Sequence, residues 1–202
     1  MTDKPSIRIN KVLRELNISL DTRKSLVMKN GLKMKINIIN DVSGLEFDQN
    51  AIKVIKEFNS PFIIHHMQGI PQTMQNMPKY NNALLDIYDF FEKKICFLKK
   101  QNVKINNVIL DPGIGFGKNL KHNLILMSKI SLFHSLGFPL MIGTSRKKFI
   151  NQISEKYDTK EKIGGTLSSV LYTLSQGVQI FRVHNVKEVK QGILVFKKLL
   201  LN

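Results

Sequence analysis

Short runs of apolar and β-branched residues alternate with longer amphipathic segments along most of the chain. The longer segments repeat their apolar positions at helical spacing, whereas the short runs have the length and composition of buried strands. The predicted strands are Ile18–Asp21, Ile36–Asp41, Phe62–Met67, Val108–Asp111, Leu140–Gly143 and Ile180–Val183. The predicted helices are Arg23–Leu32, Gln49–Phe58, Asn82–Gln101, Leu120–Leu136, Gly165–Gln176 and Val186–Leu201. Repeated strand–helix units of this kind predict an α/β fold with a parallel sheet.

The ends of the predicted strands favour one α/β architecture over another. A doubly wound open sheet gathers its site at a single switch point, whereas a (β/α)8 barrel carries functional side chains at the ends of several strands. Nearly every predicted strand here ends in polar residues. The pattern therefore favours a TIM-type barrel that lacks two of its eight strands, preceded by an amphipathic piece at Ile7–Leu16. No linker or low-complexity tract interrupts the units, which predicts a single domain over residues 1–202.

The net charge of +16 is the unusual feature of the composition. A nucleic-acid partner is one explanation, but lysines are scattered along the whole chain and their pairs fall on the polar faces of predicted helices. Compositional bias explains this distribution better, and a local anion site is a third explanation. We therefore expect no specific nucleic-acid partner.

The remaining composition indicates a protein of a reducing compartment. The single cysteine, Cys96, has no internal disulfide partner. No segment approaches the roughly 18 apolar residues of a membrane span, and Met1–Ser6 do not resemble a secretory signal. We expect a cytoplasmic protein with no membrane partner.

The segment Asp111–Lys118 follows a predicted buried strand and reads DPGIGFGK. Its glycine spacing departs from the GxGxxG of dinucleotide-binding loops, so a nucleotide site is disfavoured. A buried carboxylate at Asp111 is suited to accept two parallel N–H bonds from a guanidine-like heterocycle edge, beside glycines that let a flat ligand approach. The alternative is a carboxylate that only caps the following turn.

Two further clusters carry charge at strand ends. Arg182 and His184 lie at alternate positions, so they share one face of an extended segment. Together with Ser145-Arg146-Lys147 they fit an anion site after the last strands of a barrel, unless they serve only as surface ion-pair partners. Asp21 is expected to point into the barrel, and His65-His66 lacks the spacing of a zinc site.

Together these segments resemble the dihydropteroate synthases, the pterin-binding enzymes of folate synthesis. The matching stretches, in the family's order, are 18–22 (ISLDT), 39–44 (INDVSG), 66–75 (HMQGIPQTMQ), 111–118 (DPGIGFGK), 140–147 (LMIGTSRK), 165–167 (GTL) and 182–184 (RVH). Three positions depart from the family pattern: His65, Lys148 where relatives commonly have serine, and Asn185 where they have aspartate.

The resemblance implies a (β/α)8 barrel of which this sequence holds strands three to eight. The first strand, with an asparagine that helps to hold Mg²⁺, and the second, with a mobile loop, have no counterpart here. Ile7–Leu16 would be the remnant of the second helix, and Pro5–Arg8 does not replace the loop. Mg²⁺ is thus the implied cofactor, with no metal ligand in this chain, and turnover by this chain alone is expected to be poor.

The resemblance also implies an activity and roles for single residues. The family is a class of transferases that joins 6-hydroxymethyl-7,8-dihydropterin pyrophosphate to p-aminobenzoate and releases pyrophosphate. The implied pterin ligands are Asp21, Asn40, Asp111 and Lys147. Arg182 and His184 would bind pyrophosphate and act with Lys147 in catalysis, and Phe116 and Ser145 would lie on the p-aminobenzoate side. A homodimer is implied, and the alternatives are an inactive remnant or a pterin-binding methyltransferase module.

Overall fold

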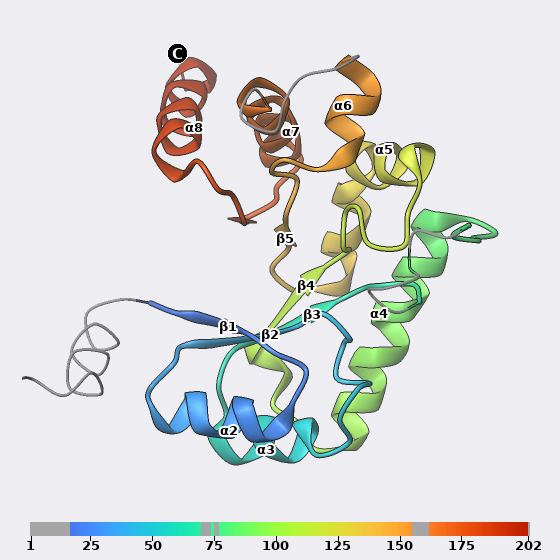
Figure 1. Cartoon of the computed structure of the whole chain (residues 1–202), viewed down its shortest axis with the longest axis vertical. Helices are drawn as coiled ribbons and strands as arrows, with labels where there is room; N and C mark the ends of the chain where they lie inside the picture. The colour runs from blue at the N-terminus through green and yellow to red at the C-terminus, as the bar shows by residue number, and fades with distance from the viewer. Residues whose placement is uncertain (1–16, 70–73, 75–76, 155–161, 202) are drawn as a thin grey trace, which may run out of the picture. The chain divides into compact units, whose positions relative to one another are not determined.

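The computed structural model describes residues 17–69, 74, 77–154 and 162–201 (Figure 1). The amphipathic piece at Ile7–Leu16, the segment Pro5–Arg8 and part of the 66–75 motif lie outside the described residues. Two compact units are present, the first drawn from Met1–His66 and Phe91–Leu110 and the second from Met67–Phe90 and Asp111–Asn202. The single domain therefore stays a prediction.

The first unit is built on parallel strands that follow chain order. Strands β1 (Ser19–Asp21), β2 (Ile38–Asp41), β3 (Phe62–His65) and β4 (Val108–Asp111) form one sheet in the order β1-β2-β3-β4. Leu20 pairs with Ile39 and Ile39 with Phe62, so the registers of neighbouring strands are aligned. All four residues of β3 and of β4 are buried, as expected for strands covered on both faces.

Helices α2 (Ser25–Lys33) and α3 (Ala51–Phe58) pack against each other in this unit, below the strands in Figure 1. In α3 the buried residues are Ala51, Val54 and Ile55, which is the i, i+3, i+4 spacing of one helical face. The long α4 (Ala83–Lys100) shows the same periodicity with Ile87, Phe91, Ile95 and Leu98. A short 3-10 turn at Ile105–Asn107 leads into β4.

The second unit contains a two-stranded parallel sheet and most of the remaining helices. Strands β5 (Met141–Ile142) and β6 (Ile180–Phe181) pair with each other. The helices are α5 (Leu120–Ser128), α6 (Lys148–Ser154), α7 (Ile163–Ser175) and α8 (Val186–Leu200), with a 3-10 segment at Ile130–Leu136. Helix α7 packs on α8, and α5 contacts both α6 and α7.

All six predicted strands are present, each within its predicted bounds. Two helical details differ from the prediction. The predicted helix Leu120–Leu136 is divided at Lys129, whose φ of −124° and ψ of 22° end α5 before the 3-10 segment begins. The short α6 was not predicted, because its seven residues bury little more than Phe149 and Ile150 and show no clear helical period. Among the described residues, no helix is long and apolar enough to cross a membrane.

Candidate functional site

The loop 111–118 begins at a buried carboxylate. Asp111 is 4% exposed at the end of β4, and its Oδ1 accepts a hydrogen bond of 2.8 Å from the backbone N–H of Gly113. One oxygen of Asp111 therefore caps the following turn, which is the alternative role considered for this carboxylate. Gly113, Gly115 and Gly117 all have positive φ, between 59° and 79°. Because residues with a Cβ are strained in that region, the three glycines make this loop path accessible.

Two side chains from outside the predicted motifs hold the loop in place. Asn123 on α5 accepts a hydrogen bond of 2.7 Å from the N–H of Gly115, and its Nδ2 donates to the carbonyl oxygen of Asn119 at 2.8 Å. The hydroxyl of Tyr80 donates to the carbonyl oxygen of Gly117 at 2.9 Å. An asparagine in a helix and a tyrosine in a loop carry no sequence signal of such roles.

Lys147 is brought against this loop from the segment after β5. Its Nζ lies 4.1 Å from the centroid of the Phe116 ring, a cation–π contact. A Cβ on Gly115 would lie 3.1 Å from Cδ of Lys147, so glycine leaves room for this approach. Burial lowers the pKa of Lys147, the Asp111 carboxylate opposes that shift, and the Arg182 guanidinium adds to it. The ammonium of Lys147 is thus influenced by three other predicted site residues: Asp111, Phe116 and Arg182.

Lys118, the lysine that ends the loop 111–118, is deeply buried. It is 3% exposed, and its Nζ donates to the carbonyl oxygen of Phe116 at 2.9 Å. Burial lowers the pKa of Lys118 to about 7, with the Asp111 carboxylate opposing the shift and the Lys147 ammonium adding to it. Lys118 is part of the predicted loop motif, but its contacts were not visible in the residue order.

Ser145 and His184 form a second contact in the same unit. The hydroxyl of Ser145, which is 5% exposed, lies 2.9 Å from Nδ1 of His184 and also accepts the backbone N–H of His184 at 3.2 Å. Arg182 and His184 are exposed while Phe181 and Val183 are less so, as the predicted alternation requires. Strand β6 nevertheless ends at Phe181, so Arg182 and His184 follow the strand and are not part of it.

The two C-terminal departures from the family pattern have separate structural settings. Asn185 is the N-cap residue of α8, and its Oδ1 accepts a hydrogen bond of 3.0 Å from Nη2 of Arg146. An amide therefore accepts from this arginine at the position where the resemblance leads us to expect an aspartate. Lys148 is exposed at the first position of α6.

The first unit holds the other two predicted pterin ligands. Asn40 is 1% exposed and its Nδ2 donates to Oδ1 of the exposed Asp21 at 2.7 Å. Oδ1 of Asn40 is buried and receives no hydrogen bond from the described residues. The structure thus brings Asp21 and Asn40 together, and their role as pterin ligands stays a prediction.

Asp41, the next residue of β2, is not among the predicted site residues. It is fully buried, and its Oδ1 accepts from the backbone N–H of Ser43 at 2.8 Å and from its hydroxyl at 2.5 Å. Burial raises the pKa of the Asp41 carboxyl against the lowering effect of these bonds and of the Arg23 guanidinium. Its second oxygen has no partner among the described residues.

The described residues offer few ligands for a metal ion. Across the described ranges, no three His, Cys, Asp or Glu side chains come together to hold an ion. Arg182 and His184, the predicted anion-binding residues, carry nitrogen groups and not the oxygen ligands that Mg²⁺ prefers. The described residues therefore do not fit a protein-built Mg²⁺ site. His65 and His66 are buried, at 2% and 7% exposed.

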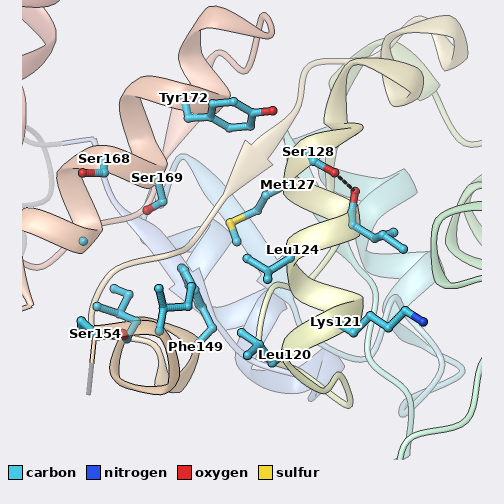
Figure 2. Close-up of a pocket in the computed structure, with 14 residues that line it drawn as sticks. Leu120, Lys121, Leu124, Met127, Ser128, Phe149, Ser154, Ser168, Ser169 and Tyr172 are labelled. Carbon is cyan, nitrogen blue, oxygen red and sulfur yellow. Dashed lines mark hydrogen bonds between the residues drawn. The ribbon is translucent and has the colours of Figure 1, made fainter. Parts of the chain in front are cut away.

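An apolar groove of about 870 Å³ lies elsewhere in the second unit, between α5, α6 and α7 (Figure 2). Leu124, Met127 and Phe149 point into it, with Tyr172 on the α7 side. Its ionisable lining residues are Lys121 and Tyr172, so it lacks the charged groups of the loop 111–118 region. An apolar surface of this kind is typical of contact with another apolar surface and not of ionic chemistry.

The comparisons with known proteins agree on one family. A family model described as a pterin binding enzyme matches residues 4–184. The dihydropteroate synthases of Synechocystis sp. and Escherichia coli K12 are 34% and 36% identical over 177 and 181 residues, which is 88% and 90% of this chain. The chain spans 61% and 64% of these two relatives, less than two thirds of their length.

Solved structures extend the agreement to the fold. Two structures of the dihydropteroate synthase from Thermus thermophilus superpose with a TM-score of 0.88. The one in complex with 6HMPPP is 30% identical, and 95% of this chain and 76% of that one are covered. The one in complex with 4-aminobenzoate is 29% identical, with 98% and 79% covered. The predicted fold class, α/β of the TIM-barrel type, is confirmed by this likeness. The chain belongs to the pterin-binding enzyme family, as its motifs predicted.

Proposed function

We propose that this chain carries the pterin and pyrophosphate chemistry of a dihydropteroate synthase. In that reaction the amine nitrogen of p-aminobenzoate forms a bond to the methylene carbon of a dihydropterin pyrophosphate. The carbon–oxygen bond to pyrophosphate breaks, pyrophosphate leaves with the electron pair, and the amine gives up a proton. The observation that carries the proposal is the cluster of Asp111, Phe116, Lys147 and Arg182 in the second unit of a chain from this family.

Asp111 and Lys147 are the proposed pterin ligands of this cluster. One oxygen of Asp111 is engaged with the Gly113 N–H, and the carboxylate keeps further acceptor capacity for the amino and amide edge of a pterin. Its negative charge also favours positive charge that develops on the pterin as the leaving group departs. Lys147, a donor only, would bond a ring nitrogen or carbonyl oxygen.

Asp21 and Asn40, in the first unit, are the other two proposed pterin ligands. The Asp21–Asn40 hydrogen bond fixes the orientation of the Asn40 amide, with Nδ2 donating to the carboxylate. Oδ1 of Asn40 then remains as a buried acceptor. A pterin amino group has the N–H donors that such an acceptor requires.

Arg182 and His184 are proposed to take the leaving pyrophosphate. Both are exposed just after β6, and Arg182 acts electrostatically on Lys147. Positive charge that meets the growing negative charge of a leaving group stabilises the transition state more than the ground state. The Ser145 hydroxyl would orient the His184 imidazole through its contact with Nδ1.

Phe116 and Ser145 are proposed for the p-aminobenzoate side. The ring of Phe116 offers a flat apolar wall beside the Lys147 ammonium. The Thermus thermophilus relative has been solved with 4-aminobenzoate, which supports a pocket for this compound in the family. The geometry of Ser145 here favours a role through His184.

Mg²⁺ dependence is proposed from the family resemblance alone, since across the described residues no three His, Cys, Asp or Glu side chains come together to hold an ion. A homodimer is also proposed from the resemblance, and a cytoplasmic location from the composition. Turnover with and without a chelator measures the Mg²⁺ dependence, and light scattering after size-exclusion chromatography measures the oligomeric state.

The test of the proposed function is formation of 7,8-dihydropteroate from both substrates with Mg²⁺, followed by chromatography. We expect product at a low rate from the parent chain and a rate about 10²-fold lower for Arg182→Gln, as for loss of one transition-state charge partner. Lys187→Gln is the matched control, since Lys187 is an exposed cation at the start of α8, and it should leave the rate unchanged. If the parent binds a pterin but forms no product at saturating substrates, the activity proposal is wrong and a binding-only remnant remains.

A further inference from the structure

Lys118 is a buried cation that the proposed reaction does not use. Lysine is almost never fully buried unless its ammonium is paired, because desolvation of the charge is costly. Here the side chain is 3% exposed and Nζ donates to the carbonyl oxygen of Phe116 at 2.9 Å. Because this burial is costly, we looked for a function of the lysine that ends the loop motif.

The contact of Lys118 leads directly to a proposed substrate-facing residue. Phe116 is held at its carbonyl by Lys118, and its ring lies 4.1 Å from Nζ of Lys147. Gly115 and Gly117 on either side have positive φ and carry no side chain that could hold the loop. The bond from Lys118 to the Phe116 carbonyl fixes the peptide whose orientation sets the direction of the ring.

The charges around Lys118 come from three elements. Asp111 at the end of β4 and Lys147 after β5 both act on it electrostatically. Burial lowers the pKa of His122 on α5, and the Lys118 and Lys121 ammonium groups add to that shift. A charge-assisted hydrogen bond is roughly twice as strong as a neutral one. The hold of Lys118 on Phe116 should therefore be firmest when its ammonium is charged and should loosen as the proton is lost.

We propose that Lys118 is a positioning residue of this site, which holds Phe116 by its backbone so that the ring forms the wall beside Lys147 and the p-aminobenzoate pocket. The proposal deepens the proposed function and rests on it for the identity of the pocket. Lys118 acts through Phe116 and need not touch a substrate. Its loss should therefore affect p-aminobenzoate more than the pterin.

The placement of the ring is tested without turnover, by NMR of the full chain. The Phe116 ring current shifts the ε-methylene signals of Lys147, and we expect this shift in the parent and in Lys118→Arg but not in Lys118→Met. Lys121→Met is the matched control, because Lys121 is an exposed lysine on α5, and it should keep the shift. A Lys147 shift unchanged in Lys118→Met would overturn the proposal.

A second measurement uses the parent chain alone and so does not depend on the folding of a variant. The nuclear Overhauser effect between the Phe116 ring protons and the Lys147 ε-methylene reports their proximity, whereas the ε-methylene chemical shift also responds to the charge of Lys147, whose own pKa is lowered by burial. This effect should weaken as pH rises through about 7, where Lys118 loses its proton. Titration of His122 is followed separately by its own ring signals. An Overhauser effect that is constant from about pH 6 to about pH 9, on either side of that pKa, would contradict the proposal.

Kinetics then separates this inference from the proposed function. We expect Lys118→Met to raise KM for p-aminobenzoate about 10-fold and to change the calorimetric affinity for a pterin analogue less than about 3-fold, as for loss of one hydrogen bond that acts on one pocket only. Equal losses for both ligands would show a merely structural role. If the parent forms no product, the proposed function fails, while the NMR measurements still decide the role of Lys118.

Discussion

Gly117→Ala is the substitution that tests the local architecture of the site most severely. Gly117 has a φ of 59°, and a Cβ placed there would clash with the carbonyl oxygen of Gln68 and lie 3.0 Å from its backbone nitrogen. Those atoms are backbone, so they cannot move aside as a flexible side chain does. The chain between Gln68 and Gly117 would have to shift.

The size of the effect follows from two separate costs and a weakened bond. An L-residue with a Cβ in the left-handed region lowers the free energy of unfolding by about 1–2 kcal/mol. Overpacking against fixed atoms adds about 1–3 kcal/mol, and displacing the Gly117 carbonyl weakens the hydrogen bond from Tyr80, worth about 1 kcal/mol. We therefore expect Gly117→Ala to lower the free energy of unfolding by about 3–6 kcal/mol.

Gly137→Ala is the matched control for this measurement. Gly137 has a φ of 81°, but nothing lies within 4 Å of the position of its missing Cβ. It should lose only the backbone strain, about 1–2 kcal/mol. Urea unfolding gives both values, provided that the dependence on denaturant concentration is unchanged between variants. Equal losses for the two glycines would refute the reasoning, because the close approach of Gln68 would then cost nothing.

Other parts of the chain carry three further predictions. Burial raises the folded-state pKa of Asp41, so the folded chain binds more protons than the unfolded chain between pH 3.8 and that raised value. The free energy of unfolding of the parent, relative to that of Asp41→Asn, should therefore fall as pH rises from about 4 to about 7. A difference between the two that does not depend on pH would contradict this prediction. Tyr80→Phe removes the donor to the Gly117 carbonyl and should cost about 1 kcal/mol in urea unfolding, whereas an unchanged midpoint would show that the bond contributes nothing. If the +16 charge reflects composition, short duplex DNA should bind without sequence preference and lose affinity steeply between about 50 and 200 mM salt; selective binding that survives about 200 mM salt would point to a nucleic-acid protein.

The elements that could be predicted well from the sequence are those with a strong local pattern. The uniformly apolar runs of β3 and β4 and the repeating apolar face of α4 come directly from residue order. The alternation of exposure from Phe181 to His184 also followed from the extended spacing, although the strand itself ends sooner. Backbone pairing, which sets where a strand ends, depends on the neighbouring strand and is not visible in a single segment.

The parts of the site that the sequence did not reveal depend on distant partners. Asn123 holds Gly115 and Tyr80 holds Gly117, contacts that join residues 8 and 37 positions apart. Lys118 was visible in the motif, but its burial and its bond to the Phe116 carbonyl came only from the fold. Charged residues at strand ends could be predicted as a group, whereas the side chains that support them could not.

The central claim, that the Asp111 region binds a pterin, is tested most directly by calorimetric titration of 6-hydroxymethylpterin into the full chain. Asp111→Asn keeps an acceptor for the Gly113 N–H but replaces a charged acceptor by an amide that also donates. That exchange should cost about 3 kcal/mol of pterin affinity, or roughly 10²-fold. Asp89→Asn, at an exposed carboxylate on α4, is the control and should bind as the parent does. Pterin binding that is lost only in Asp111→Asn is the predicted result, and equal affinity in both variants and the parent would contradict the account.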